Sequence, residues 1–243
     1  MVDGVTSVGG QIEICKACIH GKQHRLPFPP SNKHARHKLD LIHSDVCGPF
    51  PNNIGGKCYF ITFVDDHTQK GWIFFMAKKS EAYTMFRKFK ELVETATGLK
   101  IRVFCTDGGG EYTSFEFEGY LESCGIFHKK TAPHTPEQNG LTEIMNHIII
   151  ECSRCMIFEG NLSSGFWTYA FDCAIYLMNC SPVSHLPDSA PEEAWSETKP
   201  IISSFQAFSC PAYAHIPKAN HTKLAWKTRK CIMLGYEVGT TAY

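Results

Sequence analysis

The hydrophobic and polar positions at the start of the main folded region follow a period of two residues. From Leu39 to Asp45, alternate side chains form two faces, which is typical of a short strand. Two aromatic-rich apolar runs follow at 58–64 and 71–76, separated by a short polar turn. Such runs predict a β-hairpin, so the three segments together predict a three-stranded meander.

The period then changes to three or four residues, which indicates a helix. Apolar side chains recur at this spacing over residues 82–93, with Ser80 before them as a cap and Gly98 at the end. A fourth strand follows at 101–106. Because a helix separates it from the hairpin, we expect this strand to pair in parallel with its neighbour.

The remaining elements complete an α/β pattern. We expect a helix at 115–124, a fifth strand at 126–130, a long helix from Pro136 to about residue 159, and a helix at 166–178. This order predicts a mixed five-stranded sheet with helices on both faces.

The pattern divides the chain into three regions. Residues 1–37 show no sustained period and contain several prolines, so we expect an irregular N-terminal arm. Residues 38–182 hold the predicted α/β core. Residues 183–243 alternate prolines with short apolar runs, which predicts a small β-rich C-terminal extension.

Composition narrows the class of protein. A hydrophobic fraction of 43% is enough for a buried core, but no run reaches the about 18 apolar residues that span a bilayer, so we expect no membrane partner.

The formal net charge is zero, although residues 16–38 and 218–230 carry Lys and Arg without any acid. These two segments are either phosphate contacts or solvated loops. The 12 cysteines lack disulfide-framework spacing, so we expect most to be reduced core residues.

Three carboxylates stand where the predicted elements can meet. Asp45 ends the first strand, Asp107 follows the fourth, and Glu143 lies on the long helix, 35 residues beyond Asp107. Because the first and fourth strands are the natural central neighbours, we expect Asp45 and Asp107 side by side at one sheet edge. The glycines that follow Asp107 leave room for a phosphate or a metal to approach the backbone.

Three acids so arranged suit a pair of divalent metal ions. Mg²⁺ prefers oxygen ligands and keeps several waters, so one or two carboxylates per ion suffice. We expect Asp45 to contact both ions, Asp107 one of them and Glu143 the other. Because two-metal sites perform in-line displacement at phosphodiesters, the pattern predicts a nucleic-acid-processing enzyme or the remnant of one.

The motifs around these acids resemble the integrase core of copia-type LTR retrotransposons. The likeness rests on His43-Ser44-Asp45-Val46-Cys47-Gly48-Pro49, on Cys105-Thr106-Asp107-Gly108-Gly109-Gly110-Glu111-Tyr112 and on Thr135-Pro136-Glu137-Gln138-Asn139-Gly140-Leu141-Thr142-Glu143. Segments 60–66, 166–179, 15–23 and 230–236 extend it over nearly the whole chain.

This resemblance implies a ribonuclease H-like fold and a D,D-35-E triad, which falls on Asp45, Asp107 and Glu143. It also implies two Mg²⁺ or Mn²⁺ ions that drive 3′-end processing and strand transfer of element DNA into a genome. The partners would be element and target DNA and further copies of the chain. The implied location is the nucleus, or a cytoplasmic particle.

Four residues are candidates for contact with nucleic acid. Asn139 and His147 lie one helical turn before and after Glu143, so the three share one face of the long helix. Lys129 and Lys130 end the fifth strand. We expect this face and this strand end to lie toward the DNA.

The chain departs from the family pattern near the triad. The family has Asn where this chain has Gly108, and Arg where it has Ile144 and His147. Losing two arginines removes bidentate phosphate recognition from the helix. Three hypotheses therefore stay open: an active transferase, a catalytically inactive nucleic-acid-binding or interaction remnant, and a nuclease without strand transfer.

The family's zinc module is only half present. Cys15 and Cys18 match the cysteine half of a His-His-Cys-Cys site, and none of the preceding 14 residues is histidine. Because a structural Zn²⁺ needs four ligands, we expect a truncated, incomplete site. His20 and His24 could complete it only as an unfamiliar compact knuckle.

Other polar groups have simpler interpretations. We expect Asp65 and Asp66 to serve a hairpin turn rather than to replace a triad acid. Cys152 and Cys155 form a second CxxC, which we expect to pack in the core. Glu111 and Glu137 are expected to be solvated, and His134 to be a neutral loop histidine or a phosphate contact.

Overall fold

The computed structural model describes residues 34–131, 140–186, 189–220, 222 and 226–236. Most of the expected N-terminal arm, with Cys15, Cys18, His20 and His24, lies outside these residues. The boundaries expected for the three regions remain a prediction.

A five-stranded mixed sheet forms the centre of the described chain, as expected. Its strands lie in the order β3-β2-β1-β4-β5. The bounds are β1 Leu41–Cys47, β2 Tyr59–Asp65, β3 Gly71–Met76, β4 Val103–Thr106 and β5 Phe127–Lys130. The first three strands pair antiparallel, whereas β4 pairs in parallel with both β1 and β5. The meander and the parallel fourth strand are therefore confirmed.

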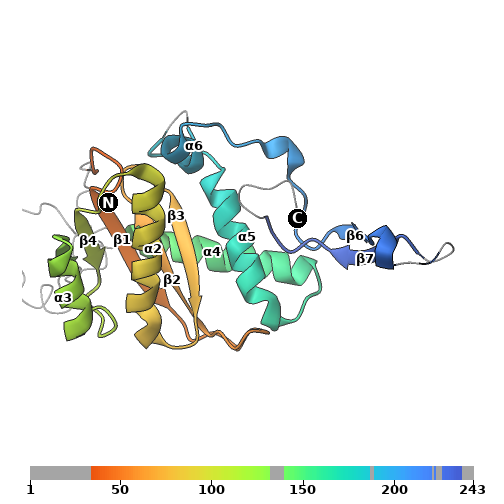
Figure 1. The fold of residues 1–243 in the computed structure, drawn as a ribbon, viewed down its shortest axis with the longest axis horizontal. Coiled ribbons are helices and arrows are strands. Elements are labelled where there is room, and N and C mark those ends of the chain that lie inside the picture. Colours follow the sequence, from red (N-terminus) through yellow and green to blue (C-terminus); the bar gives the residue numbers. More distant parts are fainter. Residues whose placement is uncertain (1–33, 132–139, 187–188, 221, 223–225, 237–243) are drawn as a thin grey trace, which may run out of the picture. The chain divides into compact units, whose positions relative to one another are not determined.

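Helices cover both faces of this sheet, and alternation along β2 explains how. Ile61 and Phe63 pack in one buried cluster with α2 (Ala82–Thr97) and α3 (Phe115–Ser123). Phe60 and Val64 point to the other face and pack with α4 (Gly140–Glu159) and α5 (Trp167–Asn179). Figure 1 shows α2 in front of the sheet and α4 behind it. The sheet thus separates two hydrophobic cores.

The C-terminal region contains more than the expected strands. A short helix, α6 (Pro191–Ser196), comes first and is followed by an antiparallel pair, β6 (Pro211–His215) with β7 (Thr228–Ile232). This pair forms its own two-stranded sheet. Short 3₁₀ segments lie at Lys79–Glu81, Ser164–Phe166, Ile202–Ser204 and Lys218–Asn220.

The expectation that most cysteines are core residues is wrong. All ten cysteines within the described ranges are free thiols, but only Cys105, Cys173 and Cys180 are buried. Cys152 and Cys155 are exposed on α4. The reason is that α4 carries apolar residues on its outer side as well, with Ile144 64% and Phe158 75% exposed. Its hydrophobic pattern therefore does not specify which side faces the core.

Membrane insertion finds no support in the helices. Among the residues that the structure describes, no helix is both long and apolar enough to cross a bilayer.

Candidate active site

The sheet places Asp45 and Asp107 at the same edge. His43 of β1 pairs with Cys105 of β4 in the parallel register, and each acid lies two residues beyond its member of that pair. Asp45 is still within β1, which continues to Cys47, and Asp107 follows the last residue of β4. The expected neighbourhood of these two acids thus follows from strand order and register.

Glu143 comes from the first turn of α4, which packs against β1 and β2. One turn later, buried Asn146 donates a hydrogen bond from Nδ2 to Asp45 Oδ2 at 2.8 Å. Its Oδ1 accepts one from buried Thr62 Oγ1 at 2.9 Å. This amide fixes the Asp45 carboxylate relative to the helix that carries Glu143.

Asp45 lies within electrostatic reach of the other two acids. Burial is the largest cause that raises the pKa of Asp45 to about 6, and the negative charge of Asp107 adds to it. The hydrogen bond from Asn146 opposes this rise, while the charge of Glu143 adds to it. A carboxylate destabilised by burial and by two like charges is a favourable place for a cation.

Backbone contacts hold the segment that carries Asp107. The N–H of Gly109 donates to Asp107 Oδ1 at 2.9 Å, and the N–H of Gly108 donates to Thr106 Oγ1 at 3.3 Å. Thr106 Oγ1 also lies 3.0 Å from His128 Nε2. Gly108 has a φ of 77°, and a Cβ on Gly109 would lie 2.9 Å from Glu111 Oε2. A β-branched residue at Gly108 would be strained, and a side chain at Gly109 would require the Glu111 carboxylate to move.

Glu111 is not solvated as expected. Its side chain is only 12% exposed and lies 3.6 Å from Lys79 Nζ. The neighbouring Tyr112 is fully buried, with its hydroxyl 3.0 Å from Ser44 Oγ. Burial raises the pKa of Tyr112 well above its usual value. Because the Tyr112 ring is anchored in the core, the adjacent Glu111 is held close to the acids.

The acids supply oxygen ligands of the kind that divalent ions prefer. In the described part of the chain, no three His, Cys, Asp or Glu side chains converge so as to hold a single ion. Pairs suffice for Mg²⁺, which completes its shell with water and phosphate oxygens. Asp45 with Asp107 would hold one ion, and Asp45 with Glu143 the other. The raised pKa of Asp45 supports this assignment, because a cation relieves the crowding of negative charge.

The candidate residues for nucleic-acid contact differ in their ion pairs. Lys129 and Lys130 are both exposed on β5, but Lys130 is paired with Glu118. His147 is 72% exposed and lies 3.5 Å from Glu151, one turn further along α4. Asn139, His134 and Glu137 lie outside the described residues. Contact with DNA stays a prediction for all four candidates.

Asp65 and Asp66 have structural partners away from the triad. The buried Asp65 carboxylate accepts hydrogen bonds from Leu39 N–H and from Thr68. Asp66 lies 3.2 Å from His43 Nε2. Asp65 therefore fixes the turn between β2 and β3, as expected, whereas the Asp66 carboxylate joins that turn to His43 of β1.

Asn146 and Thr62 were not among the site residues predicted from the sequence, and Glu111 was expected to be solvated. Asn146 has one available signal: it is a polar residue between Met145 and Ile149, which face the core, and three positions after Glu143. A buried amide there needs a partner, and the sheet edge with Asp45 is the nearest source.

Known proteins resemble the chain in sequence. Residues 35–136 match the family model described as integrase core domain, and residues 210–243 match retroviral polymerase SH3-like domain. The Pol polyprotein of transposon TNT 1-94 from Nicotiana tabacum is 43% identical over 94% of this chain. That of transposon RE1 from Arabidopsis thaliana is 32% identical over 94%. The chain spans only 17% and 16% of their respective lengths.

Solved structures resemble it in fold. A chain of the simian T-cell lymphotropic virus intasome, in complex with a PP2A regulatory subunit, has a TM-score of 0.60 at 17% identity. This match covers 89% of the present chain and 77% of that one. The HTLV-2 integrase catalytic core with magnesium has a TM-score of 0.50 at 19% identity. It covers 65% of the present chain and 96% of that one.

The sheet order and the flanking helices define a ribonuclease H-like domain of the retroviral integrase type. Within that class, residues 35–136 match the integrase core domain, and the chain resembles the integrase segment of copia-type transposon Pol polyproteins.

Proposed function

We propose that this chain is a metal-dependent polynucleotidyl transferase that cleaves element DNA and joins it to target DNA. The observation that carries the proposal is geometric: the parallel register of β1 and β4 brings Asp45 and Asp107 to one sheet edge, and Asn146 links Asp45 to the helix that carries Glu143. Such a set of oxygen ligands suits phosphodiester chemistry. The integrase core assignment supports the same reaction.

In the first reaction, a water oxygen attacks a phosphorus near the element end. The bond to the 3′-oxygen breaks and leaves a free 3′-hydroxyl. In the second, this hydroxyl oxygen attacks a phosphorus of the target, and the target's own 3′-oxygen leaves. When bound, two Mg²⁺ or Mn²⁺ ions would activate the attacking oxygen and stabilise the leaving one.

The protein's own groups position this chemistry. Asp45, Asp107 and Glu143 supply the anionic oxygens, and Asn146 holds the Asp45 carboxylate in place. Gly108 and Gly109 let the backbone beside Asp107 approach a phosphate closely. His147 occupies a position where the family has arginine, so the bidentate contact that a guanidinium makes with phosphate is lost there.

The test is cleavage and joining of labelled oligonucleotide duplexes with Mn²⁺. We expect products from the unaltered chain and a loss of at least about 100-fold in Asp107→Asn, since removal of one metal ligand disrupts the two-ion arrangement. Glu122→Gln, on the exposed side of α3, is the matched control and should retain activity.

Equal activity in Asp107→Asn would overturn the assignment of the acids. Absence of products from the unaltered chain, with DNA binding retained, would instead support a catalytically inactive DNA-binding remnant. Cleaved products without joined ones would indicate a nuclease.

The proposal includes the partners and the place of action. These are duplex DNA of the element and of the target, and further copies of this chain. The corresponding location is the nucleus, with a cytoplasmic particle as an earlier stage.

A further inference from the structure

A charged groove lies on the outer side of α2, apart from the three acids. Its volume is about 550 Å³, and its lining comes from α2, from Lys100 beyond the end of that helix, and from Tyr120 of α3. Four cations and two carboxylates face it: Arg87, Lys88, Lys90 and Lys100, with Glu91 and Glu94. The surplus of positive charge favours an anionic ligand.

Glu94 is already neutralised within the protein. Its Oε2 lies 2.7 Å from Lys100 Nζ and 3.0 Å from Lys90 Nζ, and its Oε1 accepts a hydrogen bond from Ile101 N–H at 3.1 Å. These contacts hold both lysines beside the groove. The buried carboxylate thus organises the cations and leaves no acceptor for another one.

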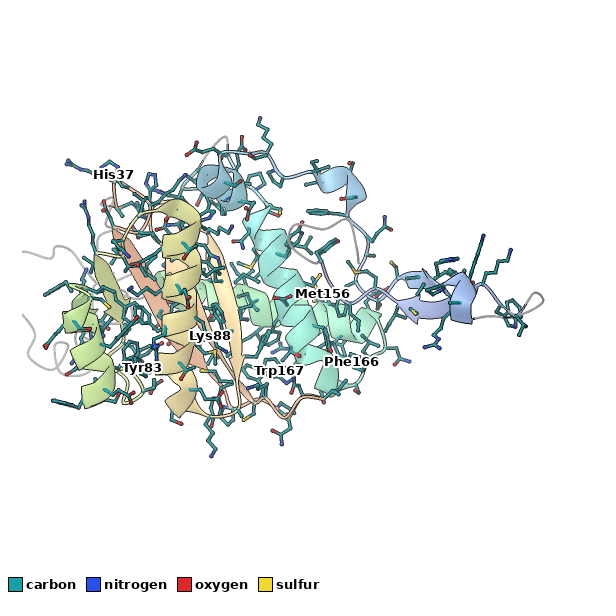
Figure 2. The ribbon with its side chains drawn as sticks, viewed as in Figure 1. His37, Tyr83, Lys88, Met156, Phe166 and Trp167 are labelled. Carbon is teal, nitrogen blue, oxygen red and sulfur yellow. The ribbon has the colours of Figure 1, made fainter. Side chains whose placement is uncertain are left out.

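Arg87 is oriented by two aromatic rings. Its guanidinium carbon lies 5.8 Å from the centre of the Tyr83 ring and 5.7 Å from that of Tyr120. The two rings meet edge to face at 5.5 Å. Figure 2 shows Tyr83 between α2 and α3, with Lys88 further along α2. A guanidinium placed over aromatic rings retains N–H groups for bidentate contact with a phosphate.

Arg87 and Lys88 are the cations available to a ligand. Across the described part of the chain, neither has an ion-pair partner, and both side chains are exposed. Glu91 is the groove's remaining carboxylate and likewise has no partner there. A ligand with several separate negative charges would contact both free cations and would be repelled by Glu91.

We propose that this groove binds the phosphodiester backbone of a nucleic-acid strand. The cations recur along one helix and its end, so they suit a row of phosphates better than one compact anion. Tyr120 adds an aromatic surface to a lining that is otherwise polar, except for the aliphatic parts of the long side chains. This site is separate from the acids, and its occupation does not require catalysis.

The test measures binding by fluorescence anisotropy, with labelled duplex DNA and single-stranded RNA of about 30 nucleotides. EDTA removes divalent ions, and the Asp107→Asn background removes catalysis, so failure of the proposed enzymatic function leaves this test intact. We expect Arg87→Gln/Lys88→Gln to bind about five- to tenfold more weakly at ~0.1 M salt, and to reduce the salt slope by about 1 to 2.

Two further variants test whether the change in binding is specific to the groove. Lys57→Gln/Lys199→Gln makes the same change of net charge at two lysines outside the groove, and should change affinity by less than about twofold. Glu91→Gln removes the unpaired carboxylate and should strengthen binding. A double groove variant that matches the control, or Glu91→Gln that binds no better than the parent, would overturn the proposal. Weakening confined to the DNA or the RNA arm identifies which strand the groove accepts.

Discussion

A single buried amide, that of Asn146, connects three elements at the candidate site, α4, β1 and β2. It extends from α4 to Asp45 on β1 and to Thr62 on β2. Without the amide, Thr62 Oγ1 would keep only its longer contact with the Asp45 carbonyl oxygen, at 3.4 Å. Asn146 is therefore a positioning residue that acts through the Asp45 carboxylate.

Replacement of Asn146 by alanine should lower both stability and the rate of DNA cleavage. We expect a loss of about 1 to 3 kcal/mol in the free energy of unfolding, since Thr62 and Asp45 each lose a hydrogen bond. The rate should fall about 10- to 100-fold, with a higher metal concentration for half-maximal activity, as for other groups that orient a metal ligand. Urea unfolding and a Mn²⁺ titration measure these effects.

Glu151→Ala, at an exposed position on the same helix, serves as the control for Asn146→Ala. An Asn146→Ala protein with an unchanged rate and unchanged metal requirement would show that Asp45 needs no such support.

At the scale of elements, α2 and β4 are joined through the Glu94 carboxylate. Burial alone would raise the pKa of Glu94, but hydrogen bonds from Lys100, Lys90 and Ile101 N–H together lower it. A carboxyl group with a lowered pKa in the folded state stabilises the fold above its ordinary pKa of 4.5. That stability is lost as the pH falls through the lowered folded pKa.

We predict that Glu94→Gln reduces the stability gained as the pH rises to and above the ordinary glutamate pKa of 4.5, because the glutamine does not ionise. At pH 7 it should cost about 1 to 3 kcal/mol, since two lysines and a backbone N–H lose a charged partner. Chemical unfolding across this pH range provides the measurement. Glu91→Gln, at an exposed position one turn earlier, makes the same substitution outside the Lys90 and Lys100 contacts and serves as the control. Parallel profiles for Glu94→Gln and the unaltered chain would contradict the prediction.

The elements themselves were predictable to within a few residues, except where the pattern was ambiguous. β3 occupies the expected residues 71–76, and α2 ends before Gly98, whose φ of 70° suits glycine. The orientation of α4 was not predictable. Apolar residues surround this helix, so only its packing against the sheet determines that Met145 and Ile149 are buried while Cys152 and Cys155 are exposed.

At the scale of the whole molecule, two parts of the described chain differ in how much apolar surface they bury. The five-stranded sheet lies between two hydrophobic clusters. The β6–β7 pair is mostly exposed, with Tyr213 at 66%, and is not joined to that sheet by strand pairing. An isolated two-stranded hairpin has little stability of its own.

We therefore predict that amide hydrogens of β6 and β7 exchange at least about 100-fold faster than those of β1 and β2. Hydrogen exchange followed by mass spectrometry would resolve the two regions in one experiment on the intact chain. Comparable protection in both would mean that the hairpin is stabilised by contacts beyond its own pairing.

The sequence by itself determined the order of strands and helices, and the positions of three acids at their ends. Those features depend on local periodicity and on short motifs. Tertiary structure decided what depends on packing between distant segments: that Asn146 supports Asp45, that Glu111 is held near the site, and that Arg87 lies between two tyrosines. These contacts join residues many positions apart, and the side-chain period of one element cannot specify which neighbour it will meet.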